Sequence, residues 1–73
     1  MKRLTLLTRE GCELCEEFER ELRVHFPAVE LQHADVDSRD EWRRRYGLRI
    51  PVLLDEWGEV LAEGRFEPAA LKG

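Results

Sequence analysis

The sequence predicts an α/β fold of the order β-α-β-α-β-β-α, in which a four-stranded mixed sheet is flanked by helices. Three observations predict this order. Short apolar runs have the pattern of strands, apolar residues recur at three- and four-residue steps between them, and glycines and prolines mark the turns. A strand-helix-strand unit followed by a hairpin needs parallel first strands, a right-handed crossover and helices on the sheet faces.

The first strand and the first helix have the clearest patterns. Residues 3–8 form a mostly apolar run flanked by charged residues, which is typical of a largely buried strand. After a turn at Gly11, the helix is predicted to begin at Cys12 and to end just before Pro27, because proline cannot continue it. The residues that share its apolar face are Leu14, Cys15, Phe18, Leu22 and Phe26.

The middle of the chain predicts a second strand over residues 29–36, followed by a short second helix. Ser38 and Glu41 match a capping box, in which each side chain accepts a hydrogen bond from a free backbone N–H of the first turn. Gly47 is predicted to close this helix. Its buried side is predicted to carry two aromatic residues four positions apart, Trp42 and Tyr46.

The last third of the chain predicts a β-hairpin and a final short helix. The runs 48–54 and 59–63 are strand-like, and the residues between them form the turn. Trp57 lies in this turn, where contact with a partner and packing against the last helix are both open. After Gly64, Pro68 suits the start of a helix that runs through residue 71.

Composition excludes several classes of protein. The 73 residues have room for one domain, over residues 1–73. A net charge of −4 argues against a nucleic-acid binder, which needs a basic face. No run reaches the ~20 apolar residues that span a bilayer, and the apolar run after Lys2-Arg3 is too short for a secretion signal. We therefore expect a cytoplasmic monomer that binds neither nucleic acid nor membrane.

Charge is unevenly distributed along the chain. Residues 10–21 carry six glutamates and one arginine, whereas residues 39–49 carry five arginines and two acidic residues. Charge runs of this kind are typical of exposed helix faces. A binding role for the arginines stays open as an alternative.

The two cysteines, Cys12 and Cys15, are predicted to be a redox dithiol. They stand where the first strand gives way to the first helix. Free N–H groups and the helix dipole at this terminus favour the thiolate of Cys12, which is the nucleophilic form. Cys15 is close enough to attack a mixed disulfide formed at Cys12. The sequence therefore predicts a thiol-disulfide oxidoreductase with Cys12 as nucleophile and Cys15 as resolving cysteine.

Two alternatives accompany this prediction. The chain is alternatively a non-catalytic interaction module, because Glu13 and the acidic residues after it repel a developing thiolate at Cys12. His25 and His33 would complete a zinc site with the cysteines, but the spacing does not match the usual zinc-finger pattern. We therefore expect no metal site.

Two segments carry a resemblance to a known family. The segments 8–15, Thr-Arg-Glu-Gly-Cys-Glu-Leu-Cys, and 46–53, Tyr-Gly-Leu-Arg-Ile-Pro-Val-Leu, resemble the glutaredoxin-like family of the thioredoxin superfamily, and most closely short bacterial glutaredoxin-like proteins. The resemblance covers essentially the whole chain. It implies a single domain of the thioredoxin-like fold with a redox-active disulfide and no bound cofactor. Its implied partners are protein disulfides or glutathione mixed disulfides, with glutathione as a candidate co-substrate. Iron–sulfur ligation through a dimer is a minor further implication.

The resemblance also implies substrate-binding residues. Pro51 is expected to be cis beside the disulfide, and Ile50 before it to offer backbone hydrogen bonds to substrate. Arg9 stands three positions before the first cysteine, where it meets a glutathione carboxylate or is an ordinary surface arginine. Gly64 partly matches the glycines that bind the amino end of glutathione. Glu13-Leu14 is a departure, since glutaredoxins commonly have Pro-Tyr between the cysteines.

Overall fold

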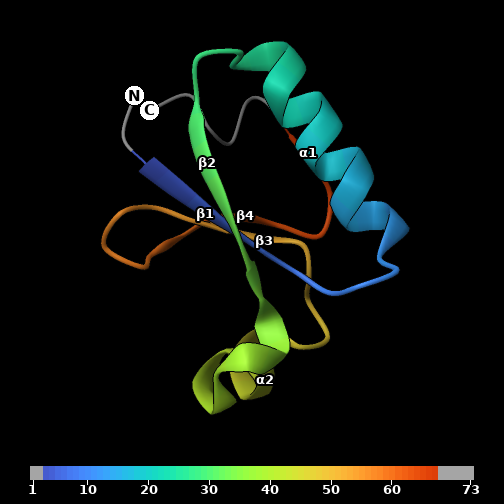
Figure 1. The fold of residues 1–73 in the computed structure, drawn as a ribbon, viewed down its shortest axis with the longest axis vertical. Coiled ribbons are helices and arrows are strands. Elements are labelled where there is room, and N and C mark those ends of the chain that lie inside the picture. Colours follow the sequence, from blue (N-terminus) through green and yellow to red (C-terminus); the bar gives the residue numbers. More distant parts are fainter. Residues whose placement is uncertain (1–2, 68–73) are drawn as a thin grey trace.

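The computed structural model describes residues 3–67, which form a four-stranded mixed sheet with two α-helices (Figure 1). The elements in chain order are β1 (Arg3–Thr8), α1 (Glu13–His25), β2 (Glu30–Asp35), the 3-10 turn η1 (Val36–Ser38), α2 (Asp40–Tyr46), β3 (Val52–Leu54) and β4 (Val60–Glu63). The predicted α/β order is confirmed up to the hairpin. The last predicted helix, at residues 68–71, lies outside the described residues.

The sheet has the strand order β2-β1-β3-β4. β1 and β2 are parallel, whereas β3 is antiparallel to both β1 and β4. The predicted parallel first pair is therefore correct, and the hairpin adds its strands at the other edge of β1. β1 lies between β2 and β3, so the loop that follows β1 leaves from the middle of one end of the sheet.

Each face of the sheet has its own apolar core, because successive side chains of a strand point to opposite faces. Leu6 and Leu53 pack under α1 with Phe18 and Leu22. On the other face, residues of β1, β3 and η1 pack with half-buried residues of α2, namely Leu7, Val36, Val52, Leu54, Trp42 and Tyr46. Figure 1 shows α1 along the sheet and α2 beyond the end of β2. The two cores hold both helices against the sheet.

The helix α1 agrees with its prediction except at Leu14. It ends at His25, where the N–H of Phe26 donates to the carbonyl of Leu22 at 2.8 Å. Cys15, Phe18 and Leu22 form its buried stripe. Leu14, predicted on the same face, is 54% exposed. Around the helix axis Leu14 stands about 40° from Phe18 but about 100° from Cys15, so its side chain lies at the flank of the buried face.

The predicted capping box at Ser38 and Glu41 is wrong. The Ser38 hydroxyl donates to the carbonyl of Asp35 at 2.6 Å, and the Asp35 carboxylate accepts the N–H of Asp37 at 2.8 Å. These local hydrogen bonds form η1, so β2 ends at Asp35 and not at Val36. Arg39 is the N-cap of α2 and makes no side-chain capping bond. Short polar side chains compete for nearby backbone groups in this way.

Two further sequence predictions concern aromatic residues. Trp42 and Tyr46 pack on the core as predicted, but they are half-buried, and the Arg39 guanidinium lies 4.6 Å from the centre of the Trp42 ring. Trp57 is 73% exposed in the hairpin turn.

Within residues 3–67 neither helix has the length and apolar character required to cross a membrane.

Candidate functional site

The two cysteines form a disulfide at the start of α1. Cys12 and Cys15 are joined with their Cα atoms 5.2 Å apart. Cys15 is 3% exposed, whereas Cys12 is only half-buried. A molecule that approaches from solvent therefore meets Cys12 first, while Cys15 is covered by the core beneath α1.

The backbone places the Cys12 sulfur at the helix terminus. Gly11 has a positive φ of 81°, which glycine adopts without steric cost, and the N–H of Cys12 donates to the carbonyl of Arg9 at 3.1 Å. This turn makes Cys12 the N-cap of α1, and its Sγ accepts the N–H of Cys15 at 3.1 Å. The predicted position of Cys12 is confirmed. A sulfur here faces the positive end of the helix dipole.

The Ile50–Pro51 peptide bond is cis, as the resemblance implies. Leu7 of β1 pairs with Val52 of the antiparallel strand β3, so Pro51 lies beside the carboxyl end of β1, from which the chain continues to Cys12. The carbonyl of Pro51 accepts the N–H of Gly64 at 2.7 Å. Pro51 and Gly64 are thus neighbours. Ile50 is half-buried against the apolar core on the α2 side of the sheet.

Arg9 is held by the chain's own carboxylate. Its Nε and Nη2 donate to the two carboxylate oxygens of Asp37, each at 2.9 Å, and its Nη1 donates to the carbonyl of Gly47 at 3.2 Å. The hydrogen bond from Arg9 is the main reason that the pKa of Asp37 is lowered from its ordinary value. Arg9 therefore ties the loop before Cys12 to η1 and to the end of α2.

A hollow of about 300 Å³ adjoins the cysteines, and no sequence pattern predicted its far wall. Glu19 and His33 line it together with both cysteines. The Glu19 carboxylate accepts one hydrogen bond from Nε of Arg23 at 2.9 Å and contacts Nε2 of His33 at 2.8 Å. Burial raises the pKa of Glu19, but its hydrogen bonds with His33 and Arg23 outweigh burial, so the pKa is lowered.

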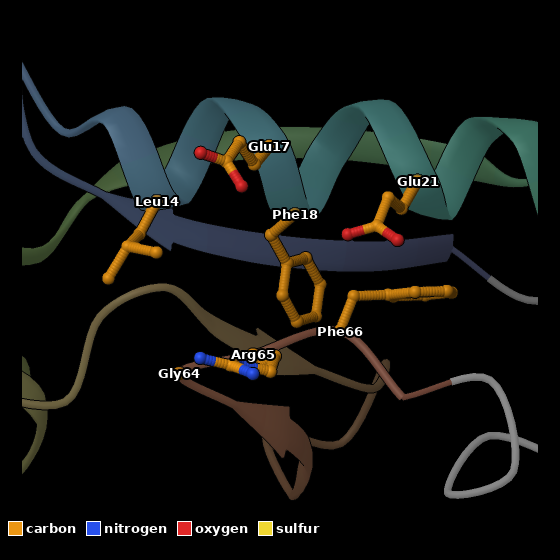
Figure 2. Close-up of a pocket in the computed structure, with 7 residues that line it drawn as sticks. All are labelled: Leu14, Glu17, Phe18, Glu21, Gly64, Arg65 and Phe66. Carbon is orange, nitrogen blue, oxygen red and sulfur yellow. The ribbon is translucent and has the colours of Figure 1, made fainter.

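A larger groove, of about 430 Å³, begins at Leu14 between the cysteines and runs along α1 (Figure 2). Gly64 belongs to its opposite wall. Of the residues predicted to bind substrate, Pro51 and Gly64 are therefore adjacent to each other, and Gly64 shares the groove with Leu14 of α1. The groove joins residues some fifty positions apart, so no local pattern in the sequence could reveal it.

The chain matches one family model and has a similar solved structure. The model of the Glutaredoxin-like domain (DUF836) matches residues 3–71. An X-ray structure of the Northeast Structural Genomics target protein XcR50 from X. campestris is 30% identical, with a TM-score of 0.72, and the match covers 94% of this chain and 89% of that one. No curated protein matches the chain. The protein therefore belongs to the Glutaredoxin-like domain (DUF836) family and has the thioredoxin-like fold.

Proposed function

We propose that this protein is a thiol-disulfide oxidoreductase that uses Cys12 and Cys15. One observation carries the proposal: Cys12 Sγ caps the first turn of α1, 3.1 Å from the N–H of Cys15, with the second sulfur in bonding range. After reduction the same N–H groups face a thiolate, which they stabilise. The more exposed Cys12 is the nucleophile, and the buried Cys15 resolves the intermediate.

The reaction proceeds by two exchanges. The Cys12 thiolate attacks one sulfur of the substrate disulfide, the substrate S–S bond breaks, and the other substrate sulfur leaves as a thiolate that takes a proton from solvent. Cys15 then loses its proton to solvent and attacks Cys12 Sγ, which releases the second substrate sulfur. Two electrons pass from the dithiol to the substrate, and the protein ends in the disulfide form. An external thiol or dithiol reduces it again by the reverse exchange.

The cis-proline segment supports a role in positioning substrate. The backbone N–H and C=O of Ile50 make none of the loop hydrogen bonds found among residues 3–67, so both are available to an extended substrate backbone. The hydrogen bond from Gly64 to Pro51 fixes the other side of this segment. Ile50, Pro51 and Gly64 thus form the substrate-binding edge in this proposal. The proposed substrates are protein disulfides and glutathione mixed disulfides.

The test is reduction of a disulfide by purified protein. We expect the protein, recycled by dithiothreitol, to accelerate insulin reduction, and the Cys12–Cys15 pair to equilibrate reversibly with a redox buffer. Cys12→Ser removes the activity, whereas Cys15→Ser accumulates a mixed disulfide at Cys12. The proposal is wrong if wild-type protein neither reduces insulin or a glutathione mixed disulfide nor shows a reversible couple.

A further inference from the structure

The groove along α1 begins at Leu14, in the first turn of the helix. Its helical wall consists of residues at three- and four-residue steps, and its opposite wall is the segment after β4; the lining residues are Leu14, Glu17, Phe18, Glu21, Gly64, Arg65 and Phe66. Figure 2 shows Leu14, Phe18 and Glu21 projecting from α1 toward the segment that carries Gly64, Arg65 and Phe66. Leu14 stands between the two cysteines in the chain, so the groove begins beside the dithiol segment, although the cysteines themselves line the smaller hollow.

The floor of the groove is apolar and consists of two aromatic rings packed against each other. Phe18 and Phe66 are 1% and 6% exposed, and their rings meet edge to face with centroids 5.4 Å apart. This arrangement is a favourable one for two aromatic rings. Leu14 adds an exposed apolar surface at the end nearest the cysteines. The floor therefore suits the aliphatic part of a side chain.

The rim of the groove is predominantly negative. Glu17 and Glu21 are exposed, and neither belongs to an ion pair among residues 3–67. Arg65 is the single cation among the lining residues. Toward the dithiol, Glu13 and Glu16 are also exposed and outside those ion pairs. A ligand that reaches Cys12 along α1 therefore passes several carboxylates that belong to no ion pair of the described residues.

We propose that the groove binds a basic polypeptide segment that flanks the substrate disulfide, an inference that rests on the oxidoreductase function proposed above. A lysine or arginine side chain has the required chemistry, because its alkyl stem covers apolar surface while its charged end stays in water. Here the stem lies over Phe18 and Phe66, and the charge meets Glu17 and Glu21. The preferred substrate is thus a protein disulfide with cationic neighbours.

The same charges disfavour glutathione. Glutathione carries two carboxylates and one ammonium group at neutral pH, so its net charge has the sign of the groove rim. Like charges at short range oppose binding. The guanidinium of Arg9 is already engaged by both oxygens of Asp37, so it does not offset this repulsion. Glutathione disulfide is therefore expected to be a poorer substrate than a basic peptide.

The experiment compares peptides that share one intramolecular disulfide and differ only at two flanking positions, which are both Lys, both Gln or both Glu. The kcat/KM of the protein for each peptide is divided by the rate constant of dithiothreitol with the same peptide, which removes intrinsic differences in disulfide reactivity. We expect the Lys peptide to exceed the Glu peptide by about three- to tenfold at low salt, and the ratio to approach one as salt screens the charges. The normalised kcat/KM for glutathione disulfide should be close to that for the Glu peptide.

A double variant and a matched control locate the effect. Glu17→Gln with Glu21→Gln should reduce the Lys-to-Glu ratio toward one, whereas Glu56→Gln with Glu59→Gln should leave it unchanged. The control removes the same charge from the exposed hairpin turn, at the end of the hairpin opposite Gly64. A ratio that is equal in wild type and the groove variant, or that falls equally in the control, overturns the inference.

Binding separates this inference from the proposed function. In a Cys12→Ser, Cys15→Ser double variant, the Lys peptide should shift the NMR amide signals of Gly64 and Phe66 more strongly than the Glu peptide. Reduction of all peptides at equal relative rates would contradict the groove inference and leave the oxidoreductase function intact. No reduction of any peptide, together with selective shifts for the Lys peptide, would refute the function and support the groove. An absence of such shifts overturns the groove inference in either case.

Discussion

Arg9 and Asp37 face each other in a bidentate pair that crosses from the loop before the dithiol to η1. Two donor nitrogens of one guanidinium meet the two oxygens of one carboxylate, and both distances are 2.9 Å. The third contact of Arg9, with the carbonyl of Gly47, extends the link to the end of α2. Planar two-point pairing is more restrictive in geometry than a single ion pair. This pair therefore fixes the position of the segment that leads to Cys12.

Asp37→Asn should lower stability in a pH-dependent way. Because Arg9 lowers the pKa of Asp37 in the folded state, its stabilising contribution is present above the unfolded value of about 3.8 and is lost as pH falls through the folded pKa. The variant should therefore have a lower urea midpoint than wild type near pH 7. The two midpoints should begin to approach each other below about pH 3.8 and converge only in stronger acid, below the lowered folded pKa of Asp37.

Glu30→Gln is a suitable control for this measurement. It breaks the exposed Arg3–Glu30 pair at 3.1 Å, which joins neighbouring strands and does not involve the segment before Cys12. We expect a smaller change in the urea midpoint, because exposed ion pairs contribute little. If Asp37→Asn is no more destabilising than this control at neutral pH, Arg9 is not anchored as the structure indicates.

Glu13→Gln should make Cys12 more reactive. Glu13 is the first residue of α1 and is exposed directly after Cys12, so its carboxylate opposes the negative charge of the thiolate. We expect the midpoint of Cys12 alkylation against pH to fall by about 0.2–0.5 unit, as for a single exposed charge. Glu59→Gln, in the hairpin turn, should not move it.

The wild-type midpoint of the same titration separates the two functions that the sequence left open. A midpoint well below the ordinary ~8.5 of a thiol agrees with an oxidoreductase. A value at or above it favours a non-catalytic interaction module. In that case the repulsion of the thiolate by the acidic residues after Cys12 outweighs its stabilisation by the helix terminus.

Local pattern predicted more of the fold than of the site. The strand Arg3–Thr8 and the end of α1 at His25 follow from runs, periodicity and Pro27, all of which act over a few residues. The error at Ser38 has a local cause too, because Asp35 offered a competing hydrogen-bond partner. The pairing of Arg9 with Asp37 and the groove could not be predicted, since both join segments that only the folded sheet brings together.

Gly64→Ala should impair both stability and turnover. Gly64 has a φ of 77°, and an added Cβ would meet nothing within 4 Å, so the cost comes from the backbone conformation alone. A residue with a Cβ loses about 1–2 kcal/mol in this region. Relaxation of this strain would move the N–H that bonds to Pro51 at 2.7 Å and disturb the substrate-binding edge. Both the urea midpoint and kcat/KM for insulin should fall.

Gly58→Ala provides the matched variant for Gly64→Ala. Its φ is 85°, an added Cβ would likewise meet nothing within 4 Å, and it lies in the hairpin turn away from Pro51. We expect a similar loss of stability and an unchanged kcat/KM. Equal activity in the two variants would show that Gly64 serves the fold and not the substrate.

Phe66→Ala should test whether the segment after β4 is part of the core. Phe66 is 6% exposed and packs edge to face on Phe18, in the cluster that also holds Leu22 and Leu53. Truncation of a buried phenylalanine costs about 3–5 kcal/mol, which is most of the stability of a small domain. Phe66→Leu, with a smaller expected loss of about 1–2 kcal/mol, keeps the measurement within range if the alanine variant unfolds.

Trp57→Ala, at a residue that is 73% exposed, should change the free energy of unfolding by less than about 0.5 kcal/mol. A loss for Phe66→Leu as small as that for Trp57→Ala would mean that Phe66 does not close the groove floor in solution.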